Sequence, residues 1–457
     1  LDLGHRNCTS RPEWNIRAEA LRTLVACAKK TFSLGAAKRR TGAAVEDNSD
    51  ESAEKKALEA VLCRYAEDSN QRVRAVGVLC LADVANNGWM LEAENYAYVC
   101  KLLDDSCHAV RLHALSILKR FADFYPEELV KGQNQGIELR LVDDAFCRLC
   151  HAMNDSSVQV RTEAATLLGE TKNVGSSFLA QTLDKKLMSK MRFLKSGGRG
   201  GGGREQFLQE WASGRVFGAD QPAEKVEEDS VSLIPSGACG AFVTGLEDEF
   251  MSVRVATVKS LGQLAGDRAD IANMAVDFLA DMFNDEIEEV RLDAVNCIQP
   301  LLRHNELKTE SMETILNVLD DALADSRKAL RNLLSRCHLS SLPCLKMTVE
   351  SLMNNLQRYP ADKESIWECM KCLGRNHPNL VLPLVSDLLG LHPFFDTPEP
   401  VIENPSYVAK LVLILNAAKD CPSMCALFPR HTWRHYKYLK YSSPGLVPEL
   451  NAFCPEL

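Results

Sequence analysis

Apolar and polar positions recur along this chain in one motif that is found seven times. The clearest copy, Asp155–Leu168 (DSSVQVRTEAATLL), has an acidic residue at a turn, followed by Val160, Ala164 and Leu168 at positions i, i+4 and i+8. Residues at those spacings lie on one face of an α-helix. The motif therefore predicts a turn at Asp155 and an amphipathic helix that begins shortly after it.

The other six copies keep the same frame, with an Arg directly after the first apolar residue. They are Asp68 with Val73, Arg74 and Gly77; Asp105 with Val110, Arg111 and Ala114; Asp248 with Val253, Arg254 and Thr257; Asp285 with Val290, Arg291 and Ala294; Asp325 with Leu330, Arg331 and Leu334; and Ile16 with Arg17 and Ala20, where Arg11 takes the acidic place. Recurrence in register is typical of stacked helical repeats.

The spacing of the motif indicates which kind of repeat is present. From Arg17 to Arg331, successive Arg positions are separated by 57, 37, 50, 93, 37 and 40 residues. Intervals near 40 fit two-helix repeats of about 40–47 residues. The sequence therefore predicts an all-α fold, an α-α superhelix of the HEAT/armadillo type, and the interval of 93 predicts an insertion.

The acidic residue and the Arg of each copy suggest an electrostatic role. The Asp is expected to accept hydrogen bonds from free amides at the start of the next helix. The Arg lies about 100° from the apolar stripe, where its stem can pack while its guanidinium reaches a neighbouring Asp. We expect a structural ladder of Asp–Arg pairs along the stack; a set of solvated Arg side chains is the alternative.

Composition changes divide the chain into three parts. Residues 1–182 form a first repeat array, and 237–457 form a second one with a proline-rich, aromatic–basic end. Between them, 183–236 is predicted to be a flexible linker or insertion, because it runs from a basic stretch through SGGRGGGGR into acidic AEKVEEDS. We find no convincing alternating strand pattern, and the run Ile137–Met153 is predicted to be an amphipathic helix.

Charge and cysteine content narrow the function. The formal net charge is −9, which disfavours a dedicated nucleic-acid binder. The seventeen cysteines have no paired spacing, so we expect free thiols in a reducing compartment. No apolar run is long enough to span a bilayer, and no membrane partner is expected.

Three motifs resemble chemical sites but fit helix packing better. Cys147–His151 matches the haem-attachment pattern CxxCH, and Cys369–Cys372 is a lone CxxC pair. His431 and His435 share a helical face, but Thr432 replaces the Glu of a HExxH zinc protease. We therefore expect no active site, no metal and no cofactor.

Two basic stretches are candidates for contact with a polyanion or a partner. The first comprises Lys185, Lys186, Lys190 and Arg192, and the second lies in RHTWRHYKYLKY and includes His431, Arg434, His435 and Lys437. A solvated face is the simpler interpretation of the first stretch, and a packed helix end of the second.

Several longer segments go beyond the generic repeat. IELRLVDDAF, QTLDKKLMS, SGACGAFV, DMFNDEIEEVRL and LVLPLV with HPFFDT closely resemble the family of the fourth subunit of the Integrator complex, in the same order along the chain. That family continues well beyond the equivalent of Leu457, and the glycine-rich Lys195–Arg204 differs from its more charged segment.

The resemblance implies a non-catalytic scaffold in the nucleus, with a cytoplasmic pool left open. It also implies partners: Integrator subunits nine and eleven, of which eleven is the nuclease, other Integrator subunits, and RNA polymerase II indirectly. The processes implied are small nuclear RNA 3′-end formation and transcription termination. Two alternatives remain, another HEAT adaptor in transport or vesicle coats, and a helical-repeat protein that binds RNA or a polyanion directly.

Overall fold

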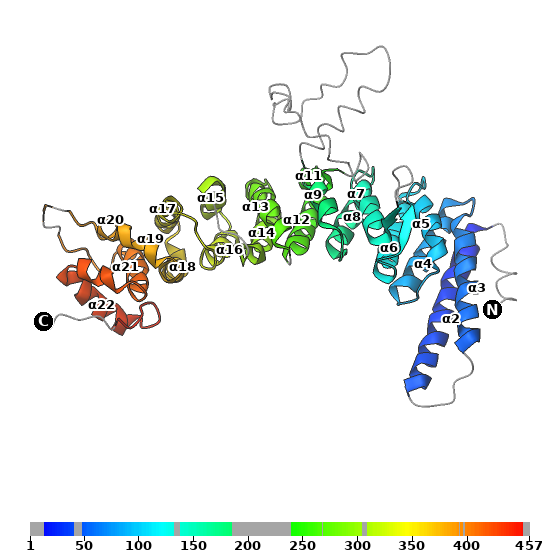
Figure 1. Ribbon diagram of the computed structural model, residues 1–457, viewed down its shortest axis with the longest axis horizontal. Helices are drawn as coiled ribbons and strands as arrows, with labels where there is room; N and C mark the ends of the chain where they lie inside the picture. Colours follow the sequence, from blue (N-terminus) through cyan, green and yellow to red (C-terminus); the bar gives the residue numbers. More distant parts are fainter. Residues whose placement is uncertain are drawn as a thin grey trace, which may run out of the picture. The chain divides into compact units, whose positions relative to one another are not determined.

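The computed structural model describes residues 13–40, 48–131, 138–184, 239–266, 268–303, 309–392, 394–395 and 398–450. It divides the chain into two compact units, Leu1–Ser260 and Leu261–Leu457, and the boundary falls within one helix. Nearly all described elements are helical (Figure 1), which confirms the all-α class. The three-part division made from composition stays a prediction.

Unit 1 is built from helices that pack against their chain neighbours and against the next pair. Its helices are α2 (Trp14–Arg40), α3 (Asn48–Ala66), α4 (Gln71–Asn86), α5 (Tyr96–Leu102), α6 (His108–Phe124), α7 (Leu141–Ala152), α8 (Val158–Glu170), α9 (Ser176–Thr182), α11 (Ala241–Leu246) and the first part of α12 (Met251–Gly266). Helix α6 packs on α4, α5, α7 and α8. The motif copies at Asp68, Asp105, Asp155 and Asp248 therefore lie just before the second helix of a pair, and the copy at Ile16 lies in α2, the first helix described.

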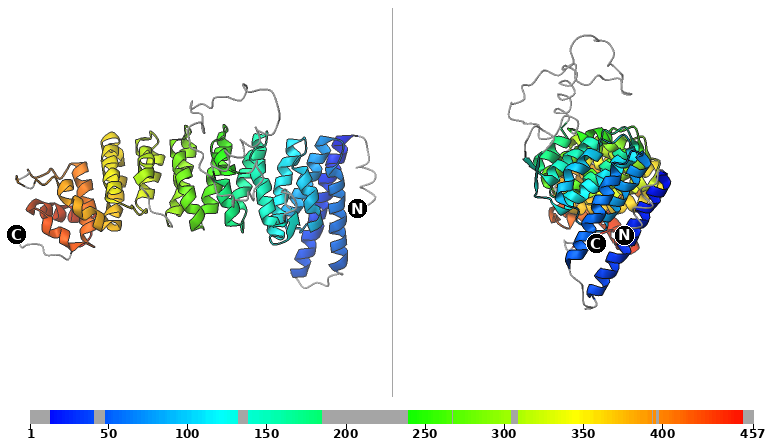
Figure 2. Two further views of the ribbon diagram at one scale, coloured as in Figure 1. Left: turned by 45° about the horizontal axis from the view of Figure 1, so that its top comes forward. Right: turned by 90° about the vertical axis from the view of Figure 1, so that its right-hand side faces the viewer.

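Unit 2 repeats this plan. Its elements include α13 (Ala269–Asp281), α14 (Glu288–Ile298), α15 (Thr309–Leu316), α16 (Ala324–Leu334), α17 (Leu342–Arg358), α18 (Lys363–Asn376), α19 (Pro378–Val381), α20 (Val385–Leu389), α21 (Pro405–Ala418) and α22 (Arg430–Ser442). Helices α13, α15 and α17 pack in one layer, and α14, α16 and α18 in another. Figure 2 shows the helices of each unit standing side by side.

The predicted apolar stripes form the core. Val110, Ala114 and Leu118 of α6 are fully buried, as are Val290 and Ala294 of α14. The small residue in the middle of the stripe allows close approach of helices. In α4 this residue is Gly77, and a Cβ there would lie 3.0 Å from the backbone nitrogen of Ala66 in α3.

One part of the first array was predicted wrongly. Residues Leu129–Lys131 (β1) and Glu138–Arg140 (β2) pair as a short antiparallel hairpin, with Val130 opposite Leu139. Helix α7 begins only at Leu141, so the start of the run predicted as a helix is a strand. Three residues a strand are too few to produce a recognisable alternation.

The described residues on either side of 185–238 lie next to each other. The backbone N–H of Gly240 donates to the carbonyl oxygen of Gln181 at 3.1 Å, and the Cys239 thiol donates to the same oxygen at 3.4 Å. Helix α11 also packs against α7 and α9. The chain therefore returns to the place where it left the array, which favours an insertion over a linker between arrays.

In unit 2 the tightest packing is that of α18 on α21. A Cβ added to Gly374 would lie 2.3 Å from the carbonyl oxygen of Leu413, closer than any real contact. We expect Gly374→Ala to lower the free energy of unfolding of unit 2 by about 1–3 kcal/mol, because the helices must move apart. Urea denaturation monitored by circular dichroism measures this change.

Gly445→Ala is the matched control, since a Cβ there meets no atom within 4 Å. Equal unfolding midpoints for the two variants would show that the α18–α21 contact yields without loss.

Candidate functional site

The acidic residue of each motif copy organises the turn in which it lies. The carboxylate of Asp155 accepts a hydrogen bond from the backbone N–H of Ser157 at 2.8 Å. Ser157 is the residue before α8, and no side chain caps that helix. The Asp therefore fixes the turn and not the first amides inside the helix, which corrects the role predicted for it.

The same carboxylate receives an Arg from the preceding repeat. Nε and Nη2 of Arg111 donate to the two oxygens of Asp155, each at 2.7 Å. Nη1 of Arg111 donates to the backbone carbonyl of Asp105 at 2.7 Å. One guanidinium thus links the turn of its own repeat to the turn of the next one, in the fork geometry that suits carboxylates.

Equivalent ion pairs occur in both units. In unit 1 they join Arg17 to Asp68 at 3.0 Å, Arg74 to Asp105 at 2.8 Å, and Arg161 to Asp248 at 2.7 Å. In unit 2 they join Arg291 to Asp321 and Arg327 to Asp362, both at 2.8 Å. Arg254 donates to the carbonyl of its own turn residue, Asp248, at 2.9 Å, and Asp285 accepts the N–H of Ile287. We call this series the Asp–Arg ladder.

The motif copy assigned to Asp325 and Arg331 is in the wrong register. The turn residue is Asp321 and not Asp325, because α16 begins at Ala324 and places Asp325 inside the helix. The ladder Arg is correspondingly Arg327, whose Nη1 donates to the carbonyl of Asp321 at 2.8 Å. Arg331 lies one helical turn further on and also reaches Asp362, at 3.0 Å.

Burial and hydrogen bonding act in opposite directions on these carboxyl groups. Burial alone raises the pKa of Asp155, but the bonds from Arg111 and the Ser157 N–H outweigh it, so its pKa lies below the ordinary value. The pKa values of Asp105, Asp321 and Asp362 are lowered in the same way. These four carboxyl groups therefore stay ionised although their side chains are largely buried.

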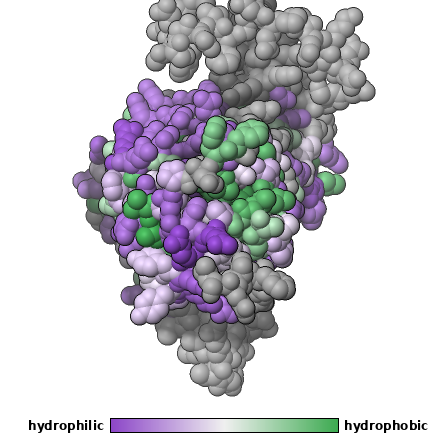
Figure 3. Space-filling view, turned by 90° about the vertical axis from the view of Figure 1, so that its left-hand side faces the viewer, coloured by the Kyte–Doolittle hydropathy of each residue, from purple (hydrophilic) through white to green (hydrophobic). Residues whose placement is uncertain are grey.

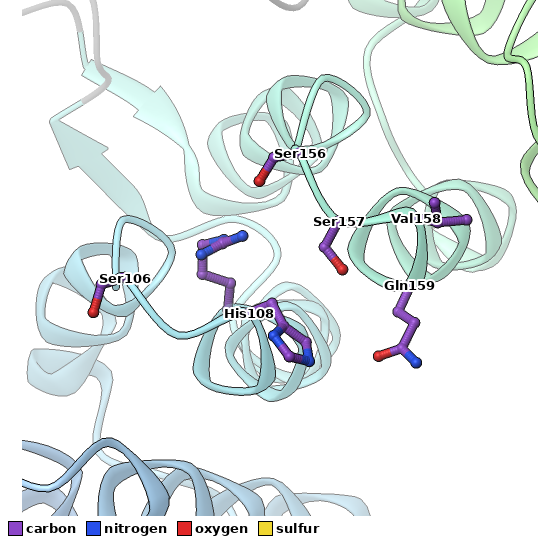
Figure 4. Close-up of a pocket in the computed structure, with 7 residues that line it drawn as sticks. Ser106, His108, Ser156, Ser157, Val158 and Gln159 are labelled. Atoms are coloured by element: carbon purple, nitrogen blue, oxygen red, sulfur yellow. The ribbon is translucent and has the colours of Figure 1, made fainter.

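An open pocket lies between two successive turns of the ladder. It is lined by Ser106, His108, Arg111, and residues 156–159. Figure 4 shows Ser156 and Ser157 on one turn and His108 at the start of the neighbouring helix. The guanidinium of Arg111 is committed to Asp155 and Asp105, which leaves hydroxyl groups, the imidazole of His108 and the carboxamide of Gln159 as polar side chains of the lining. The pocket offers no free cation for an anionic ligand.

The structure separates the residues of the second basic stretch. His435 is buried: its Nδ1 lies 2.9 Å from the Tyr407 hydroxyl and its Nε2 lies 3.1 Å from Glu399. Arg434 is exposed and donates to Glu399 at 2.7 Å, and Lys437 is exposed. Burial lowers the pKa of His435, and burial together with the neighbouring His435 lowers that of His431. The two histidines thus belong to the packing of the helix end.

Among the described residues, the remaining candidate side chains do not come together in a metal-binding group. Cys147 and Cys150 are buried in α7, His151 is exposed, and the cysteines in the described ranges are free thiols. Across those ranges, no three His, Cys, Asp or Glu residues are arranged to hold a metal ion, and no helix combines the length and apolar character needed to cross a bilayer. Lys185, Lys186, Lys190 and Arg192 lie outside the described residues.

Sequence patterns did not reveal a second set of buried polar groups. Asp144 is 1% exposed and accepts hydrogen bonds from the Tyr96 hydroxyl at 2.6 Å and from Nε of Arg148 at 2.7 Å. Glu59 is also buried; it accepts the N–H of Glu92 and the side-chain amide of Asn95 before α5. The i,i+4 spacing of Asp144 and Arg148 could have indicated that one pair from the sequence. The other partners, Tyr96, Glu92 and Asn95, are far from Asp144 and Glu59 along the chain.

The fold and its ladder define a helical-repeat protein of the HEAT/armadillo class. No protein-family model matches the chain. Solved structures with a similar arrangement include an engineered protein (TM-score 0.45, 12% identity, 98% of this chain and 96% of that one) and a designed armadillo repeat protein (TM-score 0.32, 14% identity, 60% and 98%).

Sequence comparison identifies the family. Human Integrator complex subunit 4 is 44% identical over 394 residues, 86% of this chain and 41% of the human protein. The Drosophila melanogaster protein of that name is 40% identical over 85% of this chain and 38% of its own length. The chain belongs to the Integrator complex subunit 4 family, as the resemblance predicted, and spans about two fifths of the length of these relatives.

Arg111→Lys tests the fork geometry of the ladder while keeping the charge. The ammonium group cannot make the three directed bonds, so we expect the free energy of local opening around α6 and α8 to fall by about 2 kcal/mol. Hydrogen–deuterium exchange of the amides in these two helices measures it. Arg120→Lys is the control, because Arg120 is 41% exposed; equal protection in the two variants would contradict the role of the ladder.

The lowered pKa of Asp155 predicts acid sensitivity. Its stabilising contribution is complete above the pKa of an unfolded Asp, about 3.9, and is lost as the pH falls through its lower value in the folded protein. We expect the unfolding free energy to decline from about pH 5 to pH 3, and more gently in Asp155→Asn. Urea titrations at each pH measure this slope. Asp104→Asn, at an exposed position, should keep the wild-type slope, and a wild-type slope in Asp155→Asn would refute the prediction.

Proposed function

We propose that this chain acts as a non-catalytic scaffold within the nuclear Integrator complex. The observation that supports this most is the identity of 44% across 86% of the chain to a protein named as subunit 4 of that complex. The chain spans about two fifths of the length of that relative. The proposal therefore concerns only the helical-repeat part that the two proteins share. Its place of action on this proposal is the nucleus.

The distribution of charge fits a scaffold. The ladder residues bond to one another and to their own turns, so the charges that recur most regularly serve the stacking of repeats. The surfaces of a repeat array remain available to partners, which is how such arrays are commonly used. The partners proposed are the subunit nine–eleven nuclease pair, other Integrator subunits and, through them, RNA polymerase II. The processes served are small nuclear RNA 3′-end formation and transcription termination.

Co-purification with the subunit nine–eleven pair tests this proposal. We expect the chain to co-elute with the pair in size-exclusion chromatography at moderate salt, and the complex to persist at high salt if the contact is mainly apolar. Human Integrator complex subunit 4, the longer relative, is measured in parallel. If neither elutes with the pair while the chain binds transport cargo or coat components, the assignment to Integrator is wrong.

The non-catalytic part of the proposal has its own measurement. The purified chain alone should leave a labelled small nuclear RNA precursor intact. Cleavage that follows the chain through every purification step, in preparations from two independent expression hosts, would contradict it.

A further inference from the structure

We infer that the outer face of α22 is a binding site for single-stranded RNA. This inference goes beyond the scaffold proposed above and does not depend on it. It starts from the composition of the helix. Its thirteen residues, RHTWRHYKYLKYS, include four Arg or Lys and no acidic residue, although the whole chain carries a formal net charge of −9.

The fold sorts these residues onto two faces. Thr432, Trp433, His435, Tyr436 and Leu439 are buried against the rest of unit 2. The exposed side chains are those of Arg430, Arg434, Lys437, Tyr438, Lys440, Tyr441 and Ser442. Each of them is a cation, a phenol ring or a hydroxyl group. Figure 3 looks onto the end of unit 2 that carries this helix and shows hydrophilic residues beside hydrophobic and intermediate ones.

The helical spacing turns the exposed side chains into a stripe. At 100° per residue, Arg430, Arg434, Lys437 and Tyr441 fall within about 60° of one another. Tyr438 lies at the edge of this group. Tyr441 is 91% exposed and Tyr438 is 53% exposed, so both rings are available as stacking platforms beside positive charge.

Some of these cations already have acidic neighbours, but the neighbours hold them weakly. Arg434 pairs with Glu399, with side chains 57% and 43% exposed, and Lys440 pairs with Glu449, with side chains 48% and 83% exposed. Exposed ion pairs of this kind contribute little free energy. A phosphate group can therefore compete for these cations.

The chemistry of the stripe favours RNA over an acidic protein. Proteins that bind single strands combine cations along the phosphates with aromatic rings on which bases stack. A protein interface would bury an apolar centre, and none of the exposed residues of α22 is aliphatic. The occupant that matches cations and phenol rings together is a short stretch of single-stranded RNA.

The test is fluorescence anisotropy of the full chain with a labelled twelve-nucleotide oligouridine at several salt concentrations. We expect binding that weakens with salt and is reduced about tenfold or more in the Tyr438→Ala, Tyr441→Ala double variant, because two stacking platforms are lost. Lys437→Ala should reduce the slope of log affinity against log salt by about 0.7, the value for one phosphate contact on a single strand.

Two controls separate stacking from charge and from loss of fold. The Phe394→Ala, Phe395→Ala double variant removes two other exposed rings, 85% and 72% exposed, and should bind RNA as the wild type does. Inorganic polyphosphate, which has no bases, should compete weakly and equally against the wild type and the tyrosine variant. Circular dichroism confirms that each variant is folded.

Three results would overturn the inference. They are an absence of binding, an equal RNA affinity of the tyrosine variant and the wild type, and a tyrosine variant that loses the subunit nine–eleven pair while keeping RNA. The last result would make the stripe a protein interface. Failure of co-purification alone would bear on the scaffold and leave the RNA site standing.

Discussion

The ion pair between an arginine of one repeat and an aspartate of the next is the interaction on which the stacking in each unit depends. Arg111 binds the side chain of Asp155 through two nitrogens and the backbone of Asp105 through a third. Because one carboxylate also fixes its own turn, each helix start is positioned by the repeat before it. A two-helix repeat cannot bury its apolar face alone, and the ladder sets the register in which the next repeat covers it.

The packing of repeats on both sides of each helix explains why the cysteine and histidine motifs of the sequence have structural roles. Cys147 and Cys150 of the CxxCH motif are buried side chains of α7, and His435 lies between Tyr407 and Glu399. Helices that are packed on two sides have few outward positions, so polar side chains tend to be drawn into local networks. Binding in such a molecule is expected on the helix faces that remain exposed. The exposed face of α22 is one of these, and its composition differs sharply from that of the rest of the chain.

Membership of the Integrator complex subunit 4 family and the physical picture support each other at different levels. The family assignment comes from identity along most of the chain. The ladder and the buried stripes give a reason for repeats that hold their shape while presenting surface to other proteins.

The sequence by itself determined the helical class, the apolar stripes and the recurring Asp and Arg positions, because 3.6-residue periodicity and local turns are properties of neighbouring residues. It could not choose between Asp321 with Arg327 and Asp325 with Arg331, since both pairs are six residues apart and differ by one helical turn. The start of α16 decided that register. The tertiary structure alone decided which Asp each Arg reaches, that Asp144 bonds to Tyr96 from another helix, and which residues of α22 face outward. These depend on packing between segments far apart in the chain.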